Sequence, residues 1–307
     1  MSDLYDVVIV GGGTAGLSAA LVLTRSRRTV AVVRGGAPRN APAEHMHGFL
    51  TRDGMSPGEL LDTGAAEVAG YGGELIDDLV AGVEKADGQH DFTVRLAGGR
   101  TLTARRLLIA TGLRDELPDL PGVRERWGID VLHCPYCHGY EVRDQPLGLL
   151  GGTDPRVPHL ALILPQWSAD MTLFQHTMEL SDTDRAQLAA RNVRVVEGEI
   201  ARLVIDGTLR GVELVDGRAV PCSALFIAPT FVPNADLLHT VGCGFDEKGW
   251  PVVDPSGRTT VPGVWAAGNV SNPAAQVVGA ASAGYSAAVA INVDLALAAA
   301  QVPVSTG

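Results

Sequence analysis

Residues 6–16 read Asp6-Val7-Val8-Ile9-Val10-Gly11-Gly12-Gly13-Thr14-Ala15-Gly16, and this stretch decides the fold class. Its first half is a short, β-branched apolar run that is typical of a buried strand. The segment after it, Leu17 to Thr24, is rich in Ala and Leu and is typical of a helix. A second strand-type run follows at 29–33. This order predicts a βαβ unit with glycines 11, 13 and 16 in its turn.

The glycines of this turn point to a bound dinucleotide. Gly11 permits the tight turn, Gly13 lets the backbone approach a pyrophosphate, and Gly16 lets helix pack closely on strand. A Gly-rich turn in any α/β domain is the alternative, but the place between a strand and a helix favours the dinucleotide. Arg34 stands where an acidic residue usually holds a ribose hydroxyl. The ribose contact must therefore come from elsewhere, or Arg34 meets the adenosine side by its charge.

Composition limits the classes of partner. The chain has 307 residues, 46% hydrophobic and 19% charged, which suits one large or two medium α/β domains. Its net charge of −11 argues against nucleic acid or an anionic membrane as partner. The N-terminal apolar run has no basic region before it and is far shorter than the roughly 20 residues of a membrane span. We therefore expect no signal peptide and a cytoplasmic protein.

The segment Cys134-Pro135-Tyr136-Cys137-His138 is the one candidate redox centre. Cysteines three apart lie on one face of a helix within reach of a disulfide, and a His cation or a helix N-terminus makes a thiolate reactive. The other cysteines, Cys222 and Cys243, have no cysteine neighbour at such spacing. Zinc binding is the alternative, but it needs two more ligands at a matching spacing, and His138 is too close to Cys137 to serve with it.

A second strand-and-turn pattern begins at Pro146 and predicts another βαβ unit inside the first domain. Its turn, residues 151–156, is defective for a nicotinamide dinucleotide, because Thr153 stands at the close-approach position and Arg156 at the packing position. The next strand ends in Gln175-His176-Thr177, without an arginine for the 2′-phosphate of NADPH. We expect that NADPH does not bind in the usual mode and that this domain serves as a scaffold for the cysteine pair.

The remaining segments complete an α/β pattern. Residues 56–61 predict a helix that starts with Ser56 as N-cap, Pro57 and a Glu three residues after the cap. Residues 74–80, 91–96 and 100–108 are predicted as strands, and 113–130 as a linker. Residues 274–300 are almost all small and apolar, which predicts a helix packed closely on a sheet or a cofactor.

At this point the motifs resemble those of the low-molecular-weight thioredoxin reductase family of FAD-dependent pyridine nucleotide-disulfide oxidoreductases. The resemblance covers essentially the whole chain, and both order and spacing agree. The motifs that carry it are Gly11-Gly12-Gly13-Thr14-Ala15-Gly16, Ala110-Thr111-Gly112, Cys134-Pro135-Tyr136-Cys137, Pro233-Asn234, and Gly263-Val264-Trp265-Ala266-Ala267-Gly268-Asn269 with Gln276.

The resemblance implies two Rossmann-like, three-layer ββα domains, the second inserted in the first. The FAD-binding domain would comprise residues 1–113 and 231–307, and residues 114–230 would form the inserted pyridine-nucleotide-like domain. By this likeness Cys137 would face the flavin and Cys134 would exchange with substrate. The implied FAD-binding positions are Gly11, Gly13, Thr14, Ala15, Gly16, Arg34, Arg39, Asn40, His47, Ala110, Thr111, Gly112, Gly268, Asn269, Gln276 and Val277.

Three departures from the family pattern narrow the resemblance. His138 replaces the Asp that usually follows the second cysteine. Asn269 replaces a flavin-contacting Asp, although it can still hydrogen-bond a ribityl hydroxyl. The NADPH fingerprint and its arginines are missing. Together these features resemble the dithiol oxidases that close disulfides in natural products such as holomycin, gliotoxin and romidepsin.

The resulting hypothesis is an FAD-dependent dithiol oxidase that acts on a small-molecule dithiol. A substrate thiolate attacks Cys134, the second substrate thiolate closes the product disulfide, and O2 finally takes the electrons to give H2O2. His138, or another nearby His such as His133, would deprotonate the substrate thiol. A local structural role is the alternative for His138. His45 and His47 lie in the loop that in the family passes near the flavin, and a solvated loop histidine is the alternative for each.

Two other function classes stay open at this stage. One is a thioredoxin reductase-like enzyme that takes electrons from NADPH, NADH or another donor and acts on a thioredoxin-like protein. The other is a non-catalytic flavoprotein or sensor, against which the intact cysteine pair argues. The expected partners are a small-molecule dithiol and O2, with no nucleic acid, no membrane and no metal, and the family suggests a homodimer.

Overall fold

The computed structural model describes residues 4–85 and 92–300, which form two compact units. The first unit is built from residues 1–41, 55–114 and 232–307, and the second from 42–54 and 115–231. The predicted division kept residues 42–54 in the first domain, whereas their contacts group them with the second unit. The chain crosses between the units in β7 (Leu113–Glu116) and β16 (Thr230–Pro233), and these two strands pair with each other.

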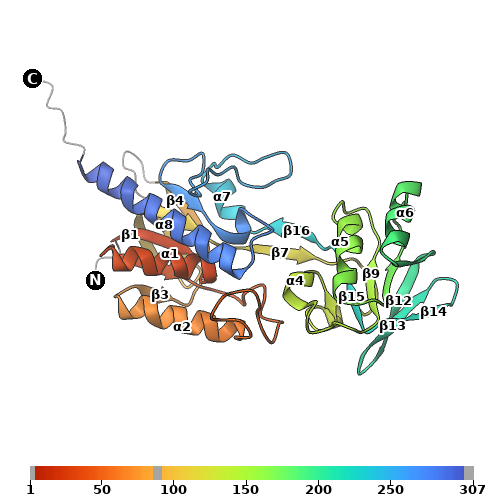
Figure 1. The fold of residues 1–307 in the computed structure, drawn as a ribbon. Coiled ribbons are helices and arrows are strands. Elements are labelled where there is room, and N and C mark those ends of the chain that lie inside the picture. Colours follow the sequence, from red (N-terminus) through yellow and green to blue (C-terminus); the bar gives the residue numbers. More distant parts are fainter. Residues whose placement is uncertain (1–3, 86–91, 301–307) are drawn as a thin grey trace, which may run out of the picture. The chain divides into compact units, whose positions relative to one another are not determined.

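The first unit is a Rossmann-like fold around a seven-stranded sheet (Figure 1). The strand order is β3-β2-β1-β6-β5-β4, and β17 pairs with β6. The strands from β3 to β6 and β17 run parallel, whereas β5 pairs antiparallel with both β4 and β6. The strand bounds are β1 Leu4–Val10, β2 Val30–Val33, β3 Glu74–Ile76, β4 Val80–Lys85, β5 Phe92–Leu96, β6 Thr101–Ile109 and β17 Val264–Ala266.

The side chains of alternate β1 residues pack into two separate hydrophobic cores, one on each face of the sheet, as expected for a strand buried on both faces. Val7 and Ile9 pack with α1 (Thr14–Arg25), α2 (Pro57–Gly70) and α8 (Val277–Ala300). Val8 and Val10 pack on the other face with β4, β5 and α7 (Asp236–Thr240). The three-layer arrangement that the family resemblance implied is therefore present.

Helix α8 lies alongside α1 (Figure 1), and small residues allow this contact. A Cβ on Gly284 would stand 2.0 Å from the carbonyl oxygen of Ala15, so the helices touch through bare backbone. By length and composition alone α8 could cross a membrane, with a mean hydropathy of 1.4 over an 18-residue window that is 28% buried. Its buried residues Ala287, Ala288 and Ile291 pack in the same core as α1, so the helix packs closely as predicted, but its closest contact is with a helix and not with a sheet or a cofactor.

The second unit repeats the layered plan around a parallel sheet of order β11-β10-β9-β15-β8. One face packs against α5 and α6, and the other packs against an antiparallel sheet of order β12-β13-β14. The helix bounds are α3 Val123–Arg126, α4 Pro135–His138, α5 Val157–Ile163 and α6 Asp182–Ala190. The strand bounds are β8 Val131–Leu132, β9 Leu147–Leu150, β10 Met171–Phe174, β11 Arg194–Val196, β12 Ile200–Asp206, β13 Thr208–Leu214, β14 Ala219–Pro221 and β15 Ala224–Phe226.

Two local predictions were wrong. The predicted linker at 113–130 contains β7 and α3, and the predicted strand at 74–80 is divided between β3 and β4. The division falls at Asp78, whose carboxylate accepts from the amides of Leu79 at 2.7 Å and Gly98 at 3.0 Å. A side chain that bonds nearby amides competes with the strand ladder, so the chain turns there. The predicted N-cap Ser56 is confirmed, because its hydroxyl accepts from the Glu59 amide.

Candidate active site

The turn between β1 and α1 leaves open space where a dinucleotide phosphate needs bare backbone. Gly11 has φ +114°, and a Cβ there would lie 2.3 Å from the carbonyl oxygen of Ala110. A Cβ on Gly16 would lie 1.9 Å from the carbonyl oxygen of Gly11. Gly13 differs, because its φ of −75° suits any residue and a Cβ there would meet no described atom within 4 Å. The fold explains the first and third glycines, whereas the described residues set no requirement for glycine at position 13.

The turn after β6 lies beside the Gly-rich turn and is held by Asn234. The amide of Ala110 donates to the Val10 carbonyl at 2.7 Å, at the end of β1. Thr111 Oγ1 donates to the Asn234 carbonyl at 2.6 Å, and Asn234 Nδ2 donates to the Thr111 carbonyl at 3.0 Å. Gly112 completes the turn with φ +71°. The pair Pro233-Asn234 therefore keeps the small-residue turn in shape.

The C-terminal turn reaches the same edge of the sheet. A Cβ on Gly268 would lie 2.8 Å from the Cβ of Ala15, which places this turn at the start of α1. Asn269 Nδ2 donates to the carbonyls of Asn272 at 3.0 Å and Ala275 at 2.9 Å. Both amide protons are thus used within the chain, so Asn269 can meet a ligand hydroxyl only as an acceptor. Gln276 and Val277 follow directly, at the start of α8.

The three turns bring most of the predicted cofactor positions together, whereas Arg34, Arg39, Asn40 and His47 lie in other segments. Arg34 Nε contacts Asp77 Oδ1 at 2.6 Å, so the charge that we expected to meet the adenosine side has a carboxylate partner. Arg39 and Asn40 are partly buried in the segment after β2. His47 belongs to the second unit.

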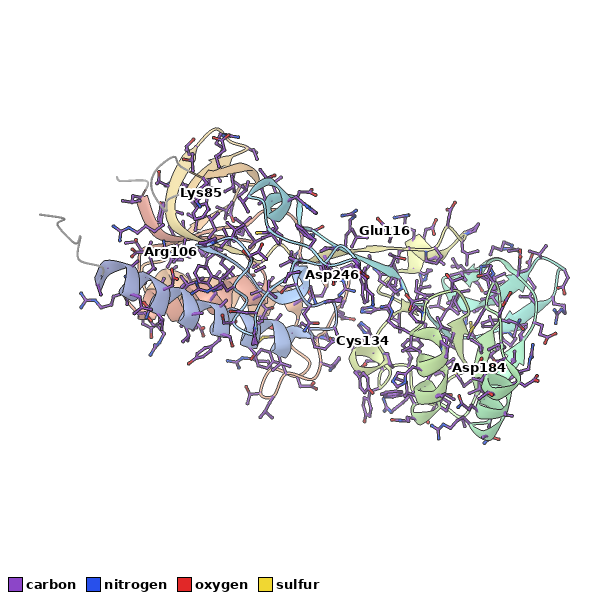
Figure 2. All side chains as sticks on the ribbon, turned by 90° about the horizontal axis from the view of Figure 1, so that it is seen from above. Lys85, Arg106, Glu116, Cys134, Asp184 and Asp246 are labelled. Atoms are coloured by element: carbon purple, nitrogen blue, oxygen red, sulfur yellow. A yellow bond between two sulfur atoms is a disulfide. The ribbon has the colours of Figure 1, made fainter. Side chains whose placement is uncertain are left out.

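The two redox cysteines form a disulfide at the carboxyl end of β8 (Figure 2 labels Cys134). Cys134 is the N-cap of α4 and Pro135 is its first residue, which is the position where a missing amide proton costs least. The amides of Cys137 and His138 donate to the Cys134 carbonyl at 3.1 and 3.2 Å. This short turn sets the Cα–Cα distance of the pair at 5.3 Å, within the normal range for a disulfide.

The two sulfur-bearing residues differ in exposure. Cys134 is 7% exposed, whereas Cys137 is partly exposed. Tyr136 between them is 70% exposed and lies edge-on to Trp167, with ring centroids 5.6 Å apart.

His138 closes α4 and carries the electrostatic features of a base. Burial lowers the pKa of His138 below its ordinary value, Glu141 acts to raise it, and His47 acts to lower it further. The net effect keeps the imidazole neutral at neutral pH, which is the form that accepts a proton. Glu141 lies on the same side of the turn three residues on, because the chain continues helically through Gly139.

His47 lies between two carboxylates. Its Nε2 is 3.4 Å from Glu141 Oε1, and its Nδ1 is 3.4 Å from Asp53 Oδ2. The amide of Gly48 donates to Asp53 Oδ1 at 2.8 Å. This backbone bond, helped by His47, lowers the pKa of the Asp53 carboxyl. His45 in the same segment has a side chain 52% exposed and lies 3.8 Å from Glu44.

Arg156 makes its contacts at the carboxyl ends of two strands of the second unit. Strands β9 and β15 are neighbours in the parallel sheet, and in Rossmann-like folds a dinucleotide binds outside the carboxyl ends of the strands. Arg156 Nε and Nη2 donate to the Asp154 carboxylate at 2.8 and 2.7 Å, and Nη2 also donates to the Pro229 carbonyl. The guanidinium lies 4.2 Å from the ring centroid of Phe231.

The Asp154–Arg156 pair is a stable feature of the turn after β9. Burial acts to raise the pKa of Asp154, but bonds from the Arg156 guanidinium and amide outweigh it, so the pKa falls. The carboxylate and guanidinium therefore both stay charged and joined at neutral pH. Arg156 thus bridges the ends of β9 and β15 where a pyrophosphate would approach.

The residue after the end of β10 that could meet a nucleotide, His176, makes a hydrogen bond within the protein. His176 has φ +48°, and its Nδ1 accepts the Ile200 amide at 3.1 Å. Burial lowers the pKa of His176, so the neutral ring that this bond requires is favoured. A neutral ring with one nitrogen in use is a poor partner for a 2′-phosphate.

The remaining cysteines are inert at neutral pH. Burial, with a contribution from Asp130, raises the pKa of Cys222 to about 12, and burial also raises the pKa of Cys243. A thiol with so high a pKa is a poor nucleophile and a poor metal ligand. Within residues 4–85 and 92–300, no three His, Cys, Asp or Glu side chains are grouped so that they could hold a metal ion.

The chain is similar to proteins of a known family. The family described as pyridine nucleotide-disulphide oxidoreductase matches residues 5–284, which includes the Gly-rich turn and the cysteine pair. The chain belongs to this family. It is therefore a flavin-dependent thiol-disulfide oxidoreductase, and the prediction of FAD as its cofactor is confirmed.

Relatives of this oxidoreductase agree over nearly its whole length. Thioredoxin reductase sirT of Leptosphaeria maculans is 33% identical over 94% of both chains, and thioredoxin reductase aclD of Aspergillus oryzae is 30% identical over 87% of this chain and 89% of its own. The crystal structure of HlmI is 55% identical, covers 96% of this chain and 94% of its own, and superimposes with a TM-score of 0.92. The predicted likeness to thioredoxin reductases and to a subgroup of them is confirmed.

Gly13 provides a test of the FAD cradle. We expect Gly13→Ala to fold normally but to bind FAD with a dissociation constant about tenfold higher. This factor corresponds to a loss of ~1.4 kcal/mol of binding free energy. The reason is that a Cβ at position 13 has room in the protein but not against a phosphate. The measurement is the ratio of visible flavin absorbance to protein absorbance after dialysis, with circular dichroism to verify folding.

The matched control for this variant is Gly58→Ala. A Cβ at position 58 also meets no described atom within 4 Å, but it lies in the first turn of α2, away from the Gly-rich turn. It should keep its full complement of FAD. Equal FAD content in the two variants would show that position 13 does not face the cofactor.

Proposed function

We propose that this oxidoreductase is an FAD-dependent dithiol oxidase that closes a disulfide in a small-molecule, natural-product dithiol, with O2 as final acceptor and H2O2 as by-product. The observation that carries the proposal is the combination of an intact Cys134–Cys137 disulfide with an Arg156 side chain bound to Asp154 and to the Pro229 carbonyl. The enzyme has the cysteine pair of its family, but the turn at 151–156 carries side chains where a nicotinamide dinucleotide needs bare backbone. The similarity to HlmI, sirT and aclD supports the same class.

The chemistry assigned to the protein's own residues is a thiol–disulfide exchange. A substrate thiolate attacks one sulfur of the enzyme disulfide, forming a mixed disulfide and releasing the other cysteine as a thiolate. The second substrate thiolate then displaces the enzyme sulfur, so the product disulfide forms as the Cys134–Cys137 bond is fully reduced. Bound FAD supplies the two-electron acceptor that restores the enzyme disulfide and gives access to O2.

His138 is the proposed catalytic base of this exchange. A free thiol has a pKa near ~8.5, so little thiolate exists at neutral pH without a base. Burial keeps His138 neutral, and it directly follows Cys137, so it can take the substrate proton at the place where the thiolate is needed. His133 is the alternative base; it stands before Cys134, and its ring lies 5.7 Å from that of Trp127 between ring centroids.

A disulfide reductase that acts on a thioredoxin-like protein is the alternative function. The family and the names of several relatives favour it, among them the thioredoxin reductase of Streptomyces coelicolor, which is 31% identical over 94% of this chain. The bonds from Arg156 to Asp154 and Pro229 weigh against it, because they hold a side chain beside the turn that would have to bind NADPH. An electron donor that docks elsewhere would be required.

We further propose a cytoplasmic homodimer, as the family suggests. Helix α8 presents an exposed apolar stripe of Val278, Tyr285, Val289, Val293 and Leu297, each 43% exposed or more. These residues follow one another at intervals of seven and then four, which places them on one face of the helix. A second copy of the chain is the occupant that this surface supports.

A single anaerobic experiment separates oxidase from reductase. We expect a small dithiol to bleach the visible flavin band of the purified protein within seconds, and micromolar NADPH or NADH to leave it unchanged. Air should then restore the colour with one equivalent of H2O2, measured with a peroxidase-coupled dye. The proposed reason is that electrons enter through the cysteine pair, whereas Arg156 stands in the turn that would have to bind the nicotinamide dinucleotide.

Each outcome of this experiment decides between the two functions. Bleaching by micromolar NADPH would overturn the oxidase proposal. Bleaching by the dithiol without return of colour in air would remove O2 as the acceptor. A Cys134→Ser sample in parallel distinguishes entry through the cysteine pair from direct reduction of the flavin by the dithiol.

A further inference from the structure

The segment 42–54 is tied to the redox helix through one histidine. This segment is part of the second unit, although it lies far from α4 in sequence. His47 reaches Glu141 Oε1 at 3.4 Å, and Glu141 is three residues beyond His138. The side chain of His47 is only 21% exposed, although the carboxylates that flank it, on Asp53 and Glu141, are 65% and 42% exposed. The imidazole of His47 is thus less exposed than either carboxylate, which suits a residue that holds another side chain in position.

The backbone at the end of α4 puts His138 and Glu141 on the same side. Gly139 keeps helical angles of φ −62° and ψ −33°, and the Val142 amide donates to the His138 carbonyl at 3.4 Å. Residues three apart on such a turn are neighbours. Among the described residues, the charged groups that act on the imidazole of His138 are Glu141, on its own turn, and His47, from the facing segment.

We propose that Glu141 is the carboxylate partner of the base His138 and that His47 is the positioning residue that holds Glu141 in place. This inference rests on the proposed function, because it assigns the support of the base that the exchange needs. His138 takes the proton from the substrate thiol and becomes an imidazolium, and the Glu141 carboxylate stabilises that cation. No electrons move in this step. Asp53 anchors His47 from the far side, and the Gly48 amide anchors Asp53.

Without its carboxylate partner, His138 would be a weaker base. Burial opposes the charged form of the imidazole, so the cation that forms during proton transfer needs a nearby anion. Glu141 is the anion on the same turn. A long, half-exposed glutamate has several rotamers, and a contact with His47 limits them. In this arrangement Glu141 is the partner of the base and His47 orients Glu141, as in other sites in which a further group orients the catalytic groups.

The test uses the intact FAD-loaded protein and measures the titration of His138 by NMR with labelled histidine, His138→Gln serving to assign the signal. Glu141→Gln should lower the titration midpoint of His138, because it removes the anion, and should lower kcat about tenfold with little change in KM. Glu141→Asp should restore part of both. His47→Gln should lower the same midpoint, because Glu141 is released from the imidazole.

The direction of the change in His47→Gln is decisive. If His47 acted on His138 only by its own positive charge, removing it would raise the midpoint. An increase would therefore overturn the positioning role, and so would an unchanged midpoint. The double variant Glu141→Gln/His47→Gln should resemble Glu141→Gln alone, because the two side chains act as one unit.

The matched control is His45→Gln in the same segment. His45 is 52% exposed, and its partner Glu44 is 90% exposed. This variant should leave both the midpoint and kcat unchanged. Thermal melting and flavin content verify that all variants are folded. The NMR midpoint does not depend on turnover. The predicted shift of the midpoint can therefore be absent although the protein oxidises a dithiol, and it can be present although the wild type oxidises none.

Discussion

Replacement of Cys134 or Cys137 by Ser is expected to lower dithiol turnover by ~10³-fold or more while FAD stays bound, since removal of a covalent nucleophile has effects of this size or larger. A lone cysteine cannot exchange with a dithiol and release it as a disulfide in a catalytic cycle. The cysteine pair lies on α4 of the second unit, whereas the turns proposed to bind FAD belong to the first. The measurements are O2 consumption with a small dithiol and the flavin spectrum of each variant.

The same variants show which sulfur exchanges with substrate. If Cys134 is the exchanging residue, as the family resemblance implies, Cys137→Ser should form a stable mixed disulfide with an oxidised substrate and Cys134→Ser should not. Intact-protein mass spectrometry detects the added mass. Adduct formation only on Cys137 would reverse the roles assigned from the resemblance. Turnover at the wild-type rate in either variant would remove the cysteine pair from the mechanism.

Replacement of His138 by Gln should lower kcat/KM at neutral pH by ~10²-fold, the lower end of what a positioned base contributes. In the wild type, burial lowers the pKa of His138 below its ordinary 6.5, so the neutral base persists down to that lower pKa. The acid limb of the pH–rate profile should therefore have its midpoint below 6.5. In the variant the rate should instead rise with pH towards the thiol pKa near ~8.5, because only pre-formed thiolate can react.

His133→Gln is the matched control for this experiment, because it removes the other histidine beside the cysteine pair. It should keep the acid limb of the wild type. Loss of that limb in His133→Gln, with the limb kept in His138→Gln, would move the role of base to His133. A wild-type profile in both variants would show that neither histidine takes the substrate proton.

The cofactor turn shows why part of the site could be predicted from sequence. The requirement at Gly11 is a backbone φ of +114°, and the requirement at Gly16 is close helix–strand packing. Both requirements arise within six consecutive residues, so the sequence motif is sufficient to predict them. The cysteine pair is local in the same sense, because Cys134, Pro135 and Cys137 share one short turn. The long predicted linker shows the limit of this reasoning, because proline and glycine there did not prevent β7 and α3 from forming.

The charges around these motifs could not be placed from sequence. Arg34 was expected to contact a nucleotide, and it is paired with Asp77 from the segment after β3. His47 was predicted as an FAD contact with a solvated loop histidine as the alternative, and the structure adds its contacts with Asp53 and Glu141 in the second unit. A long charged side chain takes whichever partner the fold brings near, and no local pattern records which residue that is.

By itself the sequence determined that this protein is a two-domain flavoprotein with a reactive cysteine pair. Glycine turns and a Cys-x-x-Cys helix start are short-range devices whose geometry depends on adjacent residues. Only the tertiary structure decided that Arg156 reaches the Pro229 carbonyl and that His47 contacts Glu141. Those contacts join segments from different strands and turns, so they exist only once the sheet of the second unit has brought their ends together.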